Sequence, residues 1–456
     1  MAPPKPAILI GIDIGTSAVK CGAWEWHRQC LGTARAPYPT VYGSGGAEQS
    51  AEDWCQAVAT VLRGVSGGVD AARIAAIAVG GHAPSPVFVD SKMRPIAPVM
   101  TWLDRRPMAF ARAVATELGR PPRGASERLT VALLARALYM RSMSRSLLSS
   151  ASCILHSWEF VIAQFTGRRV ATNAQHPELF QLMGMPPSLL PQEECLPGTV
   201  AGALSSSAAI ALGLPSGLPI VVGGLDSFLA ALGSGIAQPG DVCLNGGSSS
   251  VLAMIAPNGV EGRFKIGGHP VLSEPVSQSG MAIGLAERIA GASSTVLLQS
   301  TLEQINCLPP IDPAALLDVD ETSTIPEFEK LASRHGGAAV LRAVVDGALL
   351  LERDALRRYG RIAGSVESIR MVGGQAAAKS LRVLRAGAFA SDLAIPEVID
   401  SGTLGGAILG ATACGLVGDY QATVASMVRI AHIERPIPAV IASYARLSAD
   451  AERTRI

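Results

Sequence analysis

The sequence predicts an α/β protein of two domains, each with a mixed sheet flanked by helices. In the first half of the chain, apolar strand-like runs alternate with helical patterns. One pattern also occurs twice: an apolar run, a Gly/Ser/Thr turn and a second apolar run, centred on 15–17 and on 247–249. Because the two copies lie about half a chain apart, we expect one in each domain, with domains at 1–238 and 239–456.

Composition narrows the class of protein. The 456 residues suffice for two hydrophobic cores, and a formal net charge of +1 gives no reason to expect nucleic acid or an anionic membrane as partner. The eight cysteines form no Cys-x-x-Cys pair, so we expect free thiols in a reducing, cytoplasmic compartment. The long apolar stretch 218–236 contains Asp226, which favours a functional loop over a membrane span.

Individual elements follow from local patterns. A helix is expected over 51–63, because Ser50 is a suitable N-cap and an apolar stripe follows it. Residues 107–165 are expected to be largely helical, and a further helix is expected near 338–358. Strands are expected at 7–14, 18–26, 73–80, 86–90, 97–100, 219–223 and 368–372.

The two turns predict a site for a polyphosphate. Glycine removes the Cβ that would block the approach of an anion, so backbone N–H groups can converge on it. The residues concerned are Gly15, Thr16 and Ser17 in the first turn and Gly247, Ser248 and Ser249 in the second. We expect the two domains to hold one polyphosphate between them.

Asp13 lies in an apolar strand just before the first turn, where a charged group needs a partner. It either caps its own turn or holds Mg²⁺ beside nucleotide phosphates, and the second copy of the turn favours the magnesium role.

Asp226 follows a buried strand that ends in two glycines, and it precedes a helix of small residues. It either caps that helix or acts as a general base that takes the proton of an acceptor hydroxyl, and both roles are compatible.

Two further segments are candidates for binding. Gly373, Gly374 and Gln375 follow a strand, where paired glycines either let the backbone pack against a nucleotide or only form the turn. Polar groups also follow strands 73–80 and 97–100, and α/β proteins build pockets at such strand ends. His82 is either a sugar ligand or a structural histidine, and Arg105 or Arg106 is either surface charge or a partner of Asp104.

Together these segments resemble the FGGY carbohydrate kinase family of the actin-like ATPase superfamily, which has a ribonuclease H-like fold. The resemblance extends over nearly the whole chain and rests on motifs in the family's order. These are 11–20, the Ala-Glu-Gln-x-x-x-x-Trp segment at 47–54, Trp-x-Asp-x-Arg at 102–106, Gly-Gly-Leu-Asp at 223–226, Gly-Ser-Ser at 247–249 and Gly-Gly-Gln-Ala at 373–376.

The resemblance implies a kinase that transfers the γ-phosphoryl of ATP to a hydroxyl of a ketose or polyol, above all a ketopentose such as xylulose or ribulose. Asp226 would be the catalytic base and Asp13 would organise Mg²⁺. Residues that would bind ATP are Gly15, Thr16, Ser17, Lys20, Gly247, Ser248, Ser249, Gly373, Gly374 and Gln375. Residues that would bind the sugar are Gly81, His82, Trp102, Asp104, Arg106 and Ser227.

The chain also departs from the family pattern. The family's Leu-x-Gly-Glu-Arg-x-Pro segment is not found between 270 and 330, and Gln375 stands where the family has a glycine. These departures leave four alternatives. The chain is a shortened ketose kinase, a member with weakened catalysis, a non-catalytic sugar or nucleotide sensor, or an actin-like ATPase with another substrate. A homodimer is one candidate oligomeric state, and the sequence leaves the oligomeric state open.

Overall fold

The computed structural model describes residues 7–27, 30–172, 176–260, 264–291, 321–418 and 420–454. The chain forms two compact units. Unit 1 comprises Met1–Gly233, Gly262–Phe264 and Gly402–Met427, and unit 2 comprises Ser234–Glu261, Lys265–Ser401 and Val428–Ile456. The domains 1–238 and 239–456 stay a prediction, from which these units differ because residues 402–427 belong with unit 1.

Unit 1 is built on a six-stranded mixed sheet of order β12-β13-β6-β1-β2-β3. The strand β1 pairs antiparallel with β2 and parallel with β6, β6 pairs parallel with β13, and the edge strands β3 and β12 are antiparallel to their neighbours. The bounds of its six strands are β1 Ile8–Ile14, β2 Ala18–Glu25, β3 Cys30–Pro37, β6 Ile74–Gly81, β12 Val200–Ala203 and β13 Pro219–Leu225.

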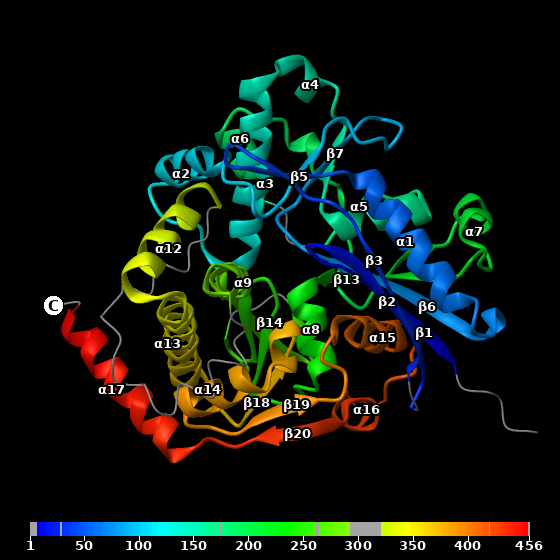
Figure 1. The fold of residues 1–456 in the computed structure, drawn as a ribbon. Coiled ribbons are helices and arrows are strands. Elements are labelled where there is room, and N and C mark those ends of the chain that lie inside the picture. Colours follow the sequence, from blue (N-terminus) through cyan, green and yellow to red (C-terminus); the bar gives the residue numbers. More distant parts are fainter. Residues whose placement is uncertain are drawn as a thin grey trace, which may run out of the picture. The chain divides into compact units, whose positions relative to one another are not determined.

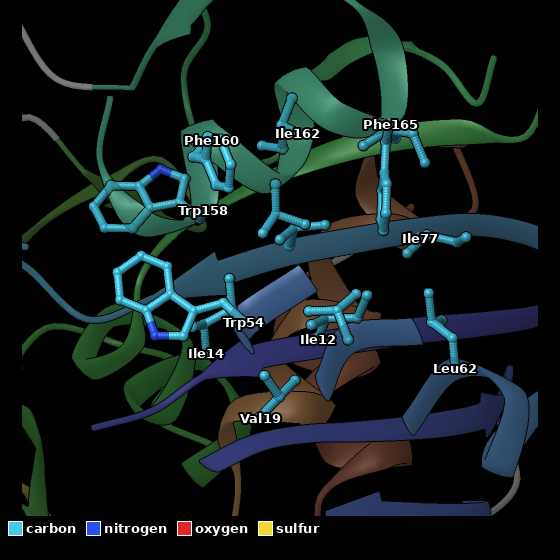
Figure 2. Close-up of a cluster of buried hydrophobic side chains, with 14 of the residues drawn as sticks. Ile12, Ile14, Val19, Trp54, Leu62, Ile77, Trp158, Phe160, Ile162 and Phe165 are labelled. Atoms are coloured by element: carbon cyan, nitrogen blue, oxygen red, sulfur yellow. The ribbon is translucent and has the colours of Figure 1, made fainter. Parts of the chain in front are cut away.

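The two faces of β1 carry different side chains. Ile8, Ile10, Ile12 and Ile14 belong to the main hydrophobic core, which α1 and α5 complete with Trp54, Trp158 and Phe160 (Figure 2). The alternate residues face α15, because a Cβ added to Gly11 would lie 1.9 Å from the carbonyl oxygen of Thr403. This glycine therefore lets α15 lie directly on the strand.

Of the remaining elements of unit 1, α2, α3, α4 and α6 form a group with a hydrophobic cluster of their own (Figure 1). The helices are α1 Ala51–Ser66, α2 Met108–Glu117, α3 Gly124–Met143, α4 Arg145–Ser149, α5 Ser157–Thr166, α6 Pro177–Leu182, α7 Ser206–Leu212, α8 Asp226–Ser234, α15 Gly402–Ala413 and α16 Tyr420–Met427, with short helices η1 Ala71–Arg73 and η2 Pro187–Leu189. The short strands are β4 Val41–Gly43, β5 Gly46–Gln49, β7 Val87–Val89, β8 Val99–Met100, β9 Cys153–Leu155, β10 Val170–Ala171 and β11 Glu193–Glu194.

Unit 2 is built on a sheet of order β16-β17-β15-β14-β18-β19-β20. Its strands are β14 Asp241–Gly246, β15 Ser250–Ile255, β16 Lys265–Ile266, β17 His269–Ser277, β18 Ser368–Val372, β19 Leu393–Pro396 and β20 Ile430–Glu434. Its helices are α9 Ser279–Ala290, α12 Glu321–His335, α13 Gly337–Ala363, η3 Gly374–Ala377, α14 Lys379–Phe389 and α17 Pro438–Thr454.

The two sheets share a strand order and a pattern of strand directions, although β12 precedes β13 in the chain whereas β20 follows β19. In unit 2, β14 pairs antiparallel with β15 and parallel with β18, β18 pairs parallel with β19, and β17 and β20 are antiparallel to their neighbours. By position in the sheet and by direction, each strand of the first sheet therefore has a counterpart in the second. In that order, β1, β2, β3, β6, β13 and β12 correspond to β14, β15, β17, β18, β19 and β20. The repeated turn of the sequence is thus the first hairpin of each sheet.

Most of the expected elements are present. The strand at 368–372 has the expected bounds, and α1 begins after Ser50, whose hydroxyl accepts the N–H of Asp53 at 3.1 Å. The expected helical stretch 107–165 is interrupted by β9. The segment 292–320, which covers much of the region that lacks the family's Gly-Glu-Arg-x-Pro motif, lies outside the described residues.

Two observations concern the chain's environment. Within the described ranges, every helix is too short or too polar to cross a bilayer. The cysteines that the structure describes are free thiols, of which Cys21, Cys153 and Cys243 are buried.

Candidate active site

The first turn joins β1 to β2 in unit 1, and other elements hold its carbonyl groups. The N–H of Gly15 donates to the carbonyl of Ala18 at 3.0 Å, which closes the turn. The hydroxyl of Tyr38 donates to the carbonyl of Gly15, and the side-chain amide of Gln49 donates to the carbonyl of Thr16 at 2.7 Å. The turn is therefore fixed from outside as well as by its own hydrogen bond.

Three acidic or basic side chains predicted for the site lie in unit 1 around Tyr38. Burial raises the pKa of this tyrosine, and the charges of Asp13 and Asp226 raise it further, so both carboxylates lie close to it. Lys20 is paired across the hairpin with Asp13 in the register of β1 and β2, and its charge acts on Asp226. The structure thus brings Asp13, Lys20 and Asp226 into one neighbourhood.

Asp226 is the first residue of α8, directly after β13. Its Oδ1 accepts the N–H of Ser227 at 2.7 Å. Burial raises the pKa of Asp226, while the Ser227 hydrogen bond and the charge of Lys20 lower it. A carboxylate with a raised pKa is a stronger proton acceptor than an ordinary aspartate, which suits a general base.

Asp13 lies on the side of β1 that faces α15. A Cβ added to Gly402, the first residue of that helix, would lie 2.7 Å from Oδ2 of Asp13. The positive end of the helix dipole therefore lies beside this carboxylate. Among the described residues no group of three or more His, Cys, Asp or Glu side chains could hold a metal, but Mg²⁺ needs only one or two carboxylates with water and phosphate oxygens. Asp13 fits that requirement.

Trp102 and His82 lie on the same side of the first turn. The indole N–H of Trp102 donates to the hydroxyl of Thr16 at 3.0 Å, and its backbone N–H donates to Ser85 Oγ at 3.1 Å. The hydroxyl of Ser85 also lies 2.8 Å from Nδ1 of His82. Ser85, which sequence reasoning did not single out, therefore connects the two residues.

His82 is buried and packs edge-on against Trp54, with ring centroids 5.3 Å apart. Burial lowers its pKa to about 3, so the imidazole is neutral at neutral pH. Its Nε2 is buried with no hydrogen-bond partner among the described residues. Gly81 beside it has no room for a side chain, because a Cβ would lie 2.6 Å from Ser157 Oγ.

Asp104 and Arg106 form an ion pair, which was one of the alternatives for Arg106. Nη2 of Arg106 lies 2.5 Å from Oδ2 of Asp104 and 2.5 Å from Oε1 of Glu48. The hydrogen bonds that Arg106 donates to Asp104 raise the pKa of Arg106. The side chain of Asp104 is fully buried and also accepts the N–H of Ala47 at 3.2 Å, so its oxygens already have protein donors. Direct binding of a sugar by this pair stays a prediction.

The second turn joins β14 to β15 in unit 2. The N–H of Gly247 donates to the carbonyl of Ser249 at 3.0 Å, two residues ahead, whereas Gly15 reaches Ala18, three residues ahead. The carbonyl of Gly247 accepts Nε2 of Gln375 at 2.9 Å, and the carbonyl of Ser248 accepts the N–H of Met281 at 3.0 Å. Ser248 is exposed.

The segment 373–375 lies beside this turn. Gly373 has φ 83°, and a Cβ there would lie 2.6 Å from the carbonyl oxygen of Gly246, so glycine is required on both grounds. Gly374 is exposed with open space around its Cα. Gln375 is buried and its side-chain amide contacts the turn, while its predicted part in binding ATP stays a prediction.

A buried polar network supports Gln375. Its Oε1 accepts Nη2 of Arg385, which pairs with Glu352 through two hydrogen bonds of 2.8 and 2.9 Å. Both charged side chains are fully buried. Glu352 also accepts the hydroxyl of Ser250 at 2.5 Å. Sequence reasoning missed Arg385 and Glu352, and it quoted Gln49 only as part of a family motif.

Comparison with known proteins identifies a family domain in the N-terminal part of the chain. Residues 8–132 match the N-terminal domain of the FGGY family of carbohydrate kinases. The chain is 26% identical to an erythritol kinase from Brucella abortus, over 90% of this chain and 88% of that protein. It is 22% identical to a gluconokinase from Bacillus subtilis, over 94% of this chain and 92% of that protein.

Solved structures confirm the expected actin-like ATPase fold. A xylulose kinase from Rhodospirillum rubrum superposes with a TM-score of 0.79 at 20% identity, over 98% of both chains. A glycerol kinase from Plasmodium falciparum, solved with ADP, superposes with a TM-score of 0.77 at 12% identity, over 99% of both chains. Residues 8–132 therefore carry the N-terminal domain of the FGGY family of carbohydrate kinases, and the relatives that align over nearly the whole chain are named as kinases.

Proposed function

We propose that this kinase transfers the γ-phosphoryl group of ATP to a hydroxyl group of a ketose or polyol, with the ketopentoses xylulose and ribulose as first candidates. The observation that carries the proposal is the environment of Asp226. This carboxylate stands at the end of a buried strand, has a raised pKa and lies within the electrostatic reach of Lys20.

In the proposed reaction, Asp226 accepts the proton of the acceptor hydroxyl as the oxygen attacks the γ-phosphorus and the bond to the β-phosphate oxygen of ATP breaks. Such a base is worth about 10²–10⁴ in rate. Lys20 favours the ionised carboxylate, because its positive charge lowers the pKa that burial raises.

The phosphates of ATP are proposed to meet the N–H groups of the two turns, at 15–17 in unit 1 and at 247–249 in unit 2. An ADP-bound relative of the same fold supports a nucleotide as the donor. Asp13 would hold Mg²⁺ through water, and the metal would neutralise charge on the transferred phosphoryl group when bound. In unit 2, Gly374 offers exposed backbone for the adenosine side.

On the acceptor side, Trp102, His82 and Ser227 are proposed to contact the sugar. The buried Nε2 of His82 has hydrogen-bonding capacity that the described protein groups leave unused, and a hydroxyl group would satisfy it. A relative named erythritol kinase aligns over 90% of this chain at 26% identity, so four-carbon polyols are the second candidate class.

One experiment tests the proposal: a coupled assay of ADP release with xylulose, ribulose, erythritol, gluconate, glycerol and aldoses. We expect sugar-dependent turnover with a ketopentose or polyol, and a loss of at least about a hundredfold in Asp226→Asn. Asp70→Asn is the matched control, because Asp70 is an exposed residue that caps η1 and asparagine caps equally well.

Other outcomes identify the alternatives. ATP turnover that no acceptor accelerates would indicate an ATPase with another substrate. Binding of sugar and nucleotide without ADP release would indicate a sensor. Normal turnover in Asp226→Asn would overturn the assignment of the base.

A further inference from the structure

The two turns are held by similar devices, although their sequences, partners and bonded positions differ. In each turn a glycine N–H donates to a carbonyl two or three residues further on, and the carbonyls of that glycine and of the next residue accept hydrogen bonds from other elements. Tyr38 and Gln49 hold the carbonyls of Gly15 and Thr16, while Gln375 and the N–H of Met281 hold those of Gly247 and Ser248.

Holding a carbonyl also sets the direction of the following N–H. A trans peptide is planar, so its C=O and N–H groups point in opposite directions. The bond from Gln49 to the Thr16 carbonyl therefore turns the N–H of Ser17 away from Gln49. By the same geometry, the bond from Gln375 to the Gly247 carbonyl turns the N–H of Ser248 away from Gln375. Ser17 and Ser248 are both exposed, so these N–H groups lie where an anion can reach them.

The orientation of each glutamine amide is fixed by a group that can only donate. The indole N–H of Trp54 donates to Oε1 of Gln49 at 3.1 Å, and the guanidinium of Arg385 donates to Oε1 of Gln375. An indole N–H and a guanidinium accept no hydrogen bonds, so each amide must present its NH₂ to the turn carbonyl. Glu352 in turn holds Arg385 in place.

We propose that Gln49 and Gln375 are paired positioning residues, each of which locks one peptide of a turn so that its N–H faces the phosphate chain. The proposal rests on the proposed function of the turns as phosphate sites. It assigns to Gln375 a contact with the turn, in place of a contact with adenosine. It also explains why a glutamine is useful at this position, where the related family motif has a glycine.

The test compares nucleotide fragments in Gln49→Met and Gln375→Met, which keep side-chain volume but remove the donor. Dissociation constants are measured by calorimetry for ADP, tripolyphosphate and adenosine, without sugar. Each variant is expected to bind ADP and tripolyphosphate about five- to tenfold more weakly, the factor that one hydrogen bond is worth, and to bind adenosine unchanged. Gln164→Met is the matched control, because its amide donates to the carbonyl of Met93 at 3.1 Å on an exposed part of unit 1.

The outcomes separate the possible causes. Equal weakening of adenosine and ADP, or unchanged ADP binding in either variant, would overturn the proposal. Adenosine binding also reports that unit 2 is folded, and Gln49→Met tests the idea in unit 1 if Gln375→Met does not fold. Since these measurements need no acceptor, a failure of the proposed sugar kinase activity would leave them interpretable.

Discussion

The indole N–H of Trp102 donates to the hydroxyl of Thr16 at 3.0 Å, across 86 residues of sequence. Trp102 belongs to the segment predicted to bind the sugar, and Thr16 belongs to the turn predicted to bind phosphate. Within unit 1, the two predicted functions therefore share a hydrogen bond, so a change on the acceptor side is expected to reach the phosphate side.

Trp102→Phe tests this coupling. The variant keeps an aromatic ring but frees the Thr16 hydroxyl, so KM for ATP is expected to rise about three- to tenfold together with KM for the sugar, since one hydrogen bond is lost. Trp24→Phe is the control, because the indole N–H of Trp24 is buried with no hydrogen-bond partner among the described residues. An effect on the sugar KM alone would argue against the coupling.

Lys20→Met is expected to move the pH profile. The charge of Lys20 lowers the pKa of Asp226, so its removal raises that pKa. Because the base must be ionised, the acid limb of kcat/KM is expected to shift to higher pH, whatever happens to the maximal rate. His82 does not contribute a limb near pH 6.5, since its pKa is about 3. A limb that stays in place or moves to lower pH would contradict the interaction.

Arg385→Met is expected to destabilise unit 2 by about 3–5 kcal/mol, because it leaves the buried carboxylate of Glu352 without its partner. The double variant with Glu352→Met is expected to be more stable than Arg385→Met alone. Urea unfolding of both variants measures the difference. The exposed pair Arg357–Asp354, 3.8 Å apart, is the control, and its loss is expected to cost less than about 1 kcal/mol.

Gly11→Ala is expected to cost about 1–3 kcal/mol in the free energy of unfolding, since the new methyl group would overlap the Thr403 carbonyl and push α15 away from β1. Because α15 begins beside Asp13, activity is expected to fall as well. Gly32→Ala is the control, because an added Cβ at Gly32 meets nothing within 4 Å. Equal thermal stability of the two variants would show that the helix tolerates displacement.

The predictable parts of the fold are those that local sequence determines. The strand 368–372 and the start of α1 at Ser50 were expected, because a short apolar run or a capping residue is visible in a single window. The helix α15 was not expected. It contains glycines that disfavour isolated helices, and packing of that glycine-rich face on β1 overrides their low propensity.

The candidate site also has a part that the local sequence predicts and a part that depends on the folded structure. Asp13, Asp226 and the two turns are predicted as site residues from their residue types and from their positions in or directly after a strand. The contacts of Gln49 with Thr16 and of Gln375 with Arg385 join residues 33 and 10 positions apart, and nothing in the local pattern pairs them. The sequence left Arg106 as either surface charge or a partner of Asp104, and the folded structure shows that it pairs with Asp104.

Although the two sheets have the same strand order, the connection between two of their corresponding strands differs greatly in length. In unit 1 the chain takes residues 82–218 to pass from β6 to β13, whereas in unit 2 it passes from β18 to β19 with residues 373–392. The longer excursion supplies Trp102 and its neighbours, and the shorter one supplies Gln375. If the predicted roles of these residues hold, the long connection can change in length and sequence without altering the sheet of unit 2, so acceptor preference and nucleotide binding are expected to vary independently.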